Sequence, residues 1–171
     1  FVAGGFGDGY LDGPYAEAKF GDVRDIAVDA SGSIYAADRS NHRIRKLSGN
    51  QVTTIAGSGN QGIQDGKGIF SSFSQPKAIT VTPSGDLIVS EQNNPALRRI
   101  APDGTVTTFE LNPPYPMAWS RLVHDTDGSL YSCRDGTGTI LRIFSDRRYA
   151  VVLSVPYTLA DFTIKDGVIY A

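Results

Sequence analysis

The residues best suited to bind a ligand are aspartates, amides and aromatics in two glycine-rich segments and in the motifs that follow them. Asp12-Gly13 and Asp65-Gly66 lie in the glycine-rich segments. Asn41 and Asn94 occupy corresponding places in two similar motifs. Carboxylates, amides and aromatic rings together suit a polar ligand such as a sugar or a peptide. The candidate ligand-binding residues are Asp12, Tyr15, Asn41, His42, Asp65, Asn94, Tyr115 and Trp119.

A structural role is the alternative for several of these residues. An aspartate that precedes glycine, as Asp12 and Asp65 do, can fold its loop back through bonds from its side chain to the backbone. Trp119 falls near a predicted strand, where a tryptophan commonly packs between sheets. His42 can bond to the backbone of its own loop. The residue types alone leave both roles open.

Metal chemistry has little support in this sequence. With two histidines and one cysteine, the chain cannot assemble a three-histidine centre. Asp8, Asp12 and Asp65 could supply the oxygen ligands that calcium prefers, but the loops lack the dense alternation of aspartates found in calcium-binding loops. His124 ends a predicted strand, where it either approaches a central channel or packs against neighbours. We expect no cofactor, and calcium is the one metal that these side chains suit.

The elements that position these residues follow from an internal repeat. When the sequence is shifted by 53 residues, Asp12 falls on Asp65 and Arg45 falls on Arg98. A third copy follows 43 residues further on, and a fourth begins near Leu159. A repeat of this length predicts a repeated supersecondary unit that stacks against its neighbours.

Each repeat contains four short apolar runs separated by turn residues. In the first copy we expect strands at residues 25–29, 33–38, 43–48 and 51–56, with Gly, Asn and Ser between them. Four antiparallel strands in a unit of this size are the blade of a β-propeller. The predicted fold is therefore all-β, an incomplete propeller ring of about three and a half four-stranded blades.

Three segments of the first copy resemble NHL repeats. They are Ile26-Ala-Val-Asp-Ala-Ser-Gly-Ser-Ile-Tyr-Ala-Ala-Asp38, Asn41-His-Arg-Ile-Arg-Lys46 and Val52-Thr-Thr-Ile-Ala-Gly57. The long insert at residues 57–73 is similar to inserts in bacterial members of that family. The resemblance implies an NHL-type β-propeller.

We expect residues 1–171 to form a partial propeller. In this division residues 1–19 end a preceding blade and its insert, residues 20–57, 73–110 and 117–155 are blades, and residues 158–171 start a further one. The chain is therefore expected to be part of a longer propeller, with its remaining blades supplied by the same or another chain. Because strand direction alternates, the long connections share one face, and we predict the ligand site there.

Neither nucleophilic catalysis nor nucleic-acid binding is indicated. Cys133 lies in an apolar run typical of an inert buried thiol, and no Gly-x-Ser-x-Gly motif occurs. Basic residues recur on the third strand of each copy, but 16 basic residues face 18 acidic ones, for a net charge of −2. A polyanion-binding protein would show a basic excess. We expect those basic side chains to pair between blades or to stay solvated.

Three functional hypotheses follow. The first is a non-catalytic binding or interaction module for a peptide, protein or glycan, without nucleic-acid binding or membrane insertion. The second is part of a metal-dependent propeller lyase, lactonase or hydrolase, and the third is a structural spacer or sensor domain. The resemblance to bacterial surface proteins implies an extracellular, periplasmic or cell-surface location.

Overall fold

The computed structural model describes residues 3–4, 8–92, 94–112, 119–134, 137–156, 159 and 161–170. Over these residues the chain is all-β apart from η1 (Gly68–Phe70), a 3-10 helix of three residues. No helix of this described part is long and apolar enough to cross a membrane. The predicted fold class is therefore confirmed at the level of secondary structure.

Sheet 1 is an antiparallel meander with one strand added at its outer edge. Its meander consists of β2 (Val23–Val28), β3 (Ile34–Asp38), β4 (Arg43–Ser48) and β5 (Gln51–Ala56). A fifth strand, β1 (Gly13–Pro14), pairs with the outer side of β5, so that the order is β1-β5-β4-β3-β2. The third and fourth strands have the predicted bounds.

Sheet 2 repeats this arrangement. Its meander consists of β7 (Pro76–Val81), β8 (Leu87–Glu91), β9 (Asn94–Ile100) and β10 (Thr105–Phe109). The added outer strand is β6 (Gly66–Lys67), and the order is β6-β10-β9-β8-β7. The two glycine-rich inserts of the sequence therefore supply the fifth strand of the sheet that follows each of them.

Sheets 3 and 4 complete the described chain. Sheet 3 has the order β11-β12-β13-β14, and β15 pairs with β16 in the small sheet 4. The bounds are β11 (Trp119–His124), β12 (Leu130–Arg134), β13 (Gly138–Ile143), β14 (Tyr149–Val155), β15 (Thr163–Lys165) and β16 (Val168–Tyr170).

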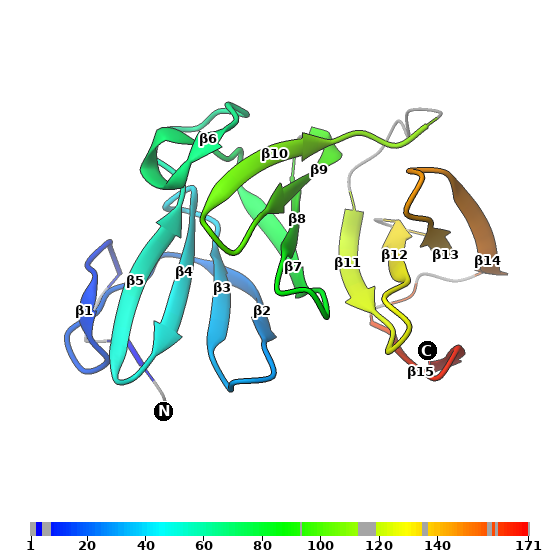
Figure 1. The fold of residues 1–171 in the computed structure, drawn as a ribbon, viewed down its shortest axis with the longest axis horizontal. Helices are drawn as coiled ribbons and strands as arrows, with labels where there is room; N and C mark the ends of the chain where they lie inside the picture. Colours follow the sequence, from blue (N-terminus) through cyan, green and yellow to red (C-terminus); the bar gives the residue numbers. More distant parts are fainter. Residues whose placement is uncertain are drawn as a thin grey trace.

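Successive sheets pack face to face, and their first strands lie side by side. β7 contacts β2 on one side and β11 on the other, as the succession of sheets in Figure 1 shows. Ala27 and Ile44 of sheet 1 pack with Ile79 and Val89 of sheet 2 in one buried cluster. Further clusters join sheet 2 to sheet 3 and sheet 3 to sheet 4. The hydrophobic core is thus divided among the interfaces between sheets.

The turn after β2 explains why β3 begins one residue later than predicted. The carboxylate of Asp29 accepts bonds from the backbone N–H groups of Ser31 and Ser33, at 2.9 and 3.0 Å. Ser33 is therefore held in the turn instead of the strand ladder. Gly32 lies within this turn at φ +83°, a conformation that glycine adopts without steric cost.

Candidate functional site

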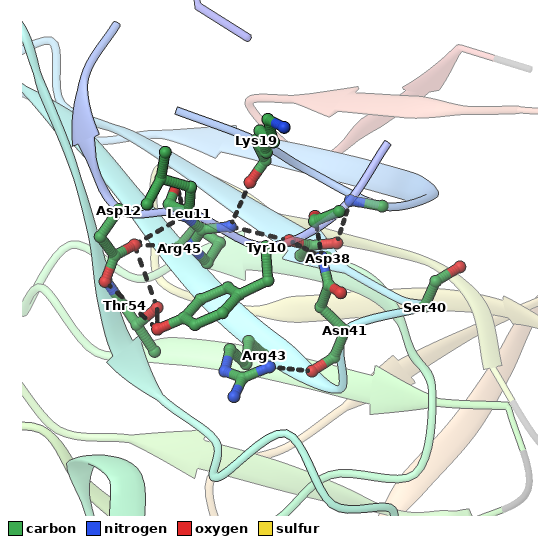
Figure 2. A network of polar contacts seen from close by, with 12 residues as sticks. Tyr10, Leu11, Asp12, Lys19, Asp38, Ser40, Asn41, Arg43, Arg45 and Thr54 are labelled. Atoms are coloured by element: carbon green, nitrogen blue, oxygen red, sulfur yellow. Dashed lines mark hydrogen bonds and ion pairs between the residues drawn. The ribbon is translucent and has the colours of Figure 1, made fainter. Parts of the chain in front are cut away.

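Asp12 of the first insert lies against a buried arginine, as Figure 2 shows. Arg45 extends from β4 with its side chain fully buried, and its Nη2 lies 2.6 Å from Asp12 Oδ1. Its Nη1 lies 2.9 Å from Oδ2 of Asp38, whose side chain is also fully buried. The same guanidinium donates to the backbone carbonyls of Leu11 and Lys19. A buried charge requires such partners, because an unpaired ion in the interior is strongly destabilising.

Asp12 also bonds to β5, the fourth strand of the meander of sheet 1. Its carboxylate accepts bonds from the backbone N–H of Thr54 at 2.9 Å and from the Thr54 hydroxyl at 3.2 Å. Together with the two contacts from Arg45 Nε and Nη2 to Oδ1, these bonds occupy most of the acceptor capacity of the carboxylate. Asp12 therefore joins the insert to both β4 and β5.

Sheet 2 contains the same arrangement at the repeat positions. Arg98 is fully buried, and its Nη2 lies 2.9 Å from Asp65 Oδ1, while its Nη1 lies 3.5 Å from Glu91 Oε2. Asp65 also accepts bonds from the backbone and hydroxyl groups of Thr108, at 3.0 and 2.9 Å. Burial by itself raises the pKa of Asp65, but the bonds from Thr108 and Arg98 outweigh it and lower the pKa.

The sequence did not identify Arg45 and Arg98 as members of these networks. We expected the basic residues of the third strands to pair between blades or to stay solvated, and for these two residues that expectation is wrong. Each bonds within its own sheet and to the insert that covers that sheet. The signal was available, because Asp12 and Arg45 recur together 53 residues later as Asp65 and Arg98.

The two candidate asparagines bond to the buried acids of these networks. Asn41 Nδ2 donates to Asp38 Oδ2 at 2.9 Å and to the backbone carbonyl of Gly9 at 2.8 Å. Asn94 is buried, and its Nδ2 donates to Glu91 Oε2 at 2.6 Å. The structure therefore brings each asparagine together with the insert aspartate of its own sheet through one buried arginine and its acid.

The remaining candidates lie apart from these networks. His42 Nδ1 accepts a bond from the backbone N–H of Gln75 at 3.2 Å, and Tyr15 packs against the buried cluster of Ala18 and Leu47. Trp119 is fully buried, and its indole N–H donates to the carbonyl of Pro95 at 2.9 Å. Tyr115 lies outside the described residues.

A cavity of about 460 Å³ lies where the turns between the first and second strands of sheets 1, 2 and 3 meet. This is the opposite end of the inner strands from the point where the long connections leave the sheets. The lining includes the apolar side chains of Ala30, Val81 and Pro83, together with Thr82 and His124. A second hollow continues along β2, β7 and β11 and shares Val81 and His124 with the first.

The walls of this cavity are held by carboxylates that bond to their own turn or to a neighbouring one. Asp29 accepts the Ser31 hydroxyl at 2.6 Å and the Tyr35 hydroxyl at 3.0 Å, and chiefly the Ser31 bond lowers the pKa of Asp29 to about 2. Asp125 accepts the backbone N–H groups of Asp166 and Gly167, at 3.0 and 2.8 Å. The cavity therefore has a fixed rim before any ligand arrives.

His124 contributes a neutral imidazole to the cavity. Its Nδ1 lies 3.4 Å from the hydroxyl oxygen of Thr80, and burial lowers the pKa of His124 to about 4. At neutral pH the ring therefore presents one donor and one acceptor and carries no positive charge.

An ion pair joins the inner strands further along the channel. Arg121 Nη1 of β11 lies 2.9 Å from Asp25 Oδ1 of β2, and its Nε lies 3.0 Å from Asp161 Oδ1. Asp25 also accepts the backbone N–H of Ile79 of β7 at 3.0 Å. Burial raises the pKa of Asp25 in spite of these bonds. This pair connects sheets 1, 2 and 3 with the segment that precedes β15.

Within the part of the chain that the structure describes, no group of three or more His, Cys, Asp or Glu side chains is arranged to hold a metal ion. The predicted calcium ligands Asp12 and Asp65 bond instead to arginine and threonine side chains.

Antiparallel meanders that pack face to face, with their inner strands side by side, define a β-propeller. Residues 20–47 match the family model of the NHL repeat, which confirms the predicted resemblance of this segment to NHL repeats. The protein SUPPRESSOR OF QUENCHING 1, chloroplastic, from Arabidopsis thaliana is 36% identical to the chain over 124 residues. That match covers 67% of the chain and 12% of the relative, so the chain spans about an eighth of the relative's length.

Solved structures share the fold. A catalytically inactive virginiamycin B lyase from Staphylococcus aureus, with quinupristin, is similar with a TM-score of 0.62 at 18% identity, over 85% of this chain and 48% of the lyase. A gluconolactonase from Xanthomonas campestris is similar with a TM-score of 0.57 at 12% identity, over 78% of this chain and 48% of that protein. At these identities the likeness shows the fold alone.

Proposed function

We propose that this propeller is a binding module that takes a peptide segment of a partner protein at the cavity between the first turns of sheets 1, 2 and 3. The observation that carries the proposal is the cavity itself, about 460 Å³ in volume and open at the end of the inner strands. Small-molecule and peptide sites are concave, mostly apolar and fixed by a few polar groups.

The lining of the cavity fits a peptide better than a sugar. Ala30, Val81 and Pro83 give an apolar surface that an inserted aliphatic or aromatic side chain would cover. The neutral imidazole of His124 stands beside that surface and can bond to the peptide backbone. The Thr82 hydroxyl already bonds within its own turn, to the Ser84 hydroxyl and the Asp86 N–H. The carboxylate of Asp29 already accepts bonds from its own turn, and the carboxylate of Asp125 accepts bonds from the turn between β15 and β16.

The polar residues of the long connections are occupied within the chain. Asp12 and Asp65 bond to buried arginines, and Asn41 bonds to a buried aspartate. A ligand at that face would have to compete with these bonds. We therefore place the peptide in the cavity between the first turns of sheets 1, 2 and 3. The face of the long connections, which the sequence predicted as the ligand site, serves as the control surface.

A phage-displayed heptapeptide library panned on the immobilised domain tests this proposal. Ala30→Trp fills the cavity from an exposed position of its rim and should weaken enriched peptides at least tenfold. Thr53→Trp, at an exposed position of the outer strand β5, is the matched control and should leave binding unchanged. Tyr10→Ala alters the face of the long connections. Equal affinity of Ala30→Trp for the enriched peptides, or loss of binding in Tyr10→Ala alone, would overturn the assignment.

A further inference from the structure

The outer edges of sheets 1 and 2 are covered by short extended segments of the chain itself. Gly13 pairs with Val52 on β5, and Gly66 pairs with Val106 on β10, both in antiparallel register. The outermost strand of a sheet otherwise presents unpaired N–H and C=O groups to solvent. The outer side of the fourth strand of a meander can therefore pair with an extended segment.

At one position of each covered edge, side chains of the sheet bond to an aspartate of the insert. Thr54 stands opposite Arg45, and Thr108 stands opposite Arg98. At both positions the threonine N–H faces outward and donates to the insert aspartate, and the threonine hydroxyl and the arginine bond to the same carboxylate. We call this group of one arginine, one threonine and one aspartate the edge latch.

Sheet 3 has apolar residues at the same register. Leu141 stands opposite Val151, in the places of the arginine and the threonine. Leu141 is fully buried, whereas Val151 is 61% exposed. Neither side chain can bond to a carboxylate, so an aspartate at this position would lack the arginine and hydroxyl bonds that it makes in sheets 1 and 2.

Among the described residues, no strand covers the outer side of β14. Sheet 3 ends at β14, whereas sheets 1 and 2 continue to β1 and β6. From the described part of the preceding connection, the Asn112 N–H donates to the carbonyl of Arg147 in the turn before the strand. The segment Tyr149–Val155 contains no charged residue of the kind that commonly protects an exposed edge.

We propose that the outer edge of β14 binds a short extended segment of a partner protein by antiparallel strand addition. The segment pairs with the N–H and C=O groups of Val151 and places an apolar side chain where the inserts place Asp12 and Asp65. Main-chain bonds supply affinity in this mode of recognition, and the side chain that meets Leu141 and Val151 supplies specificity. This proposal does not depend on the peptide site at the channel end.

The register of β14 favours a short foreign segment over a second copy of the same strand. Leu141 pairs with Val151 and Ile140 pairs with Leu153, which leaves Val152 as a bulged residue. A bulge interrupts continuous pairing at an edge. If two copies of β14 paired along their length, each copy would bring its own bulge to the pairing. A segment as short as β1 or β6 fits beside Val151 without crossing the bulge.

The chain's own insert provides a probe. An eight-residue peptide with the sequence of residues 10–17 carries the extended segment of sheet 1, and its Asp12→Val form carries an apolar residue at the latch position. We expect the Asp12→Val peptide to shift the Val151 amide in ¹H–¹⁵N spectra of the protein and to slow its hydrogen exchange. The peptide that keeps Asp12 should bind at least tenfold more weakly.

Two variants of the protein identify the edge. Val151→Pro removes the outward N–H and should abolish the shifts that the peptide causes in the neighbouring Ala150 and Val152 amides. Val151→Lys keeps the backbone donor but replaces the apolar side chain, so the Asp12→Val peptide should lose its advantage over the peptide that keeps Asp12. Ile69→Thr removes an exposed apolar side chain from η1 and is the control that should bind as the wild type does. Circular dichroism confirms that each variant is folded.

Three results would overturn the proposal. The first is an unmoved Val151 amide at peptide concentrations up to about 2 mM, which would detect a Kd in the millimolar range. The second is equal binding of the two peptides. The third is a concentration-dependent shift of the same amide in the absence of peptide, because that would identify a second copy as the occupant.

Discussion

Asp12 and Arg45 are 33 positions apart in the chain, yet Asp12 Oδ1 lies 2.6 Å from Arg45 Nη2. The guanidinium is fully buried and also pairs with Asp38, so one arginine joins the insert, β4 and the end of β3. Arg98 does the same for Asp65 and Glu91 in sheet 2. The glycine-rich inserts are therefore part of the sheets and not separate loops.

Arg45→Met should destabilise the chain by about 3–5 kcal/mol, because it leaves the fully buried carboxylate of Asp38 without its counter-charge. Urea unfolding followed by circular dichroism at pH 7 measures the change. Arg148→Met removes an exposed pair with Asp146 and is the matched control, with an expected change of about 0.5 kcal/mol or less. Similar losses for the two variants would show that the buried network contributes no more than a surface ion pair.

Gly57→Ala should prevent the junction between β5 and the second insert from closing. Gly57 has φ +100°, and an added Cβ would lie 3.0 Å from the Cα of Arg43 and closer still to the His42 carbonyl oxygen. We expect the free energy of unfolding to fall by more than about 3 kcal/mol, because the strain of the positive φ adds to the steric clash of the Cβ with the backbone.

Gly32→Ala separates the two causes. Gly32 has φ +83° with nothing within 4 Å of an added Cβ, so the substitution introduces backbone strain alone and should cost about 1 kcal/mol. Denaturant midpoints of the two variants give the comparison. A loss in Gly57→Ala no larger than that in Gly32→Ala would contradict the close approach of the chain at this junction.

The repeat and its strands were predictable because their signals are local. Glycine and asparagine turns between β-branched runs gave the bounds of β4 (Arg43–Ser48) and β5 (Gln51–Ala56) without error. The edge latch was not identified, although Asp12 and Arg45 recur at the same spacing as Asp65 and Arg98. A guanidinium on a strand can face solvent or the interior, and only the packing of the insert over β4 decides which.

The cavity at the channel end has no local signal at all. Ala30, Val81 and Pro83 are unremarkable turn and strand residues, and they come together only when three sheets align their first turns. The same holds for Asp25 and Arg121, which form an ion pair across 96 positions of sequence. Contacts of this kind depend on the angle between successive sheets, which no motif in the sequence records.

Trp119→Phe should destabilise the interface between sheets 2 and 3. The indole is fully buried and donates to the Pro95 carbonyl, so phenylalanine leaves both a small cavity and an unsatisfied acceptor. We expect a loss of about 2–3 kcal/mol in urea unfolding. Phe70→Leu, at a ring that is 77% exposed, is the control and should change stability by about 0.5 kcal/mol or less.

The same tryptophan reports on the interface directly. It is the one tryptophan in the sequence, so its fluorescence belongs to a single site. Emission of the folded protein should be blue-shifted and poorly quenched by iodide, and both properties should be lost in the unfolding transition. Ready quenching in the folded state would contradict the burial of Trp119.

His124 should make the protein less stable as the pH falls through the ordinary histidine range. Burial lowers the pKa of His124 from 6.5 to about 4, so between these values the unfolded chain binds a proton that the folded chain does not. The stability that the neutral ring contributes is present above pH 6.5 and is lost progressively below it. With a pKa of about 4, the loss between pH 7.5 and pH 5.5 has an upper limit of about 1.4 kcal/mol.

His124→Gln isolates this effect, because glutamine keeps a polar group near Thr80 and does not titrate. Asp29 and Asp103, each with a pKa of about 2, lose their contributions only well below pH 5.5. Asp25, whose pKa is raised, acts in the opposite direction, because the folded chain takes up its proton first. Urea midpoints at pH 7.5, 6.5 and 5.5 should therefore fall more steeply for the wild type than for His124→Gln. Parallel pH profiles would show that the imidazole is solvated at the channel end and is not held neutral by burial.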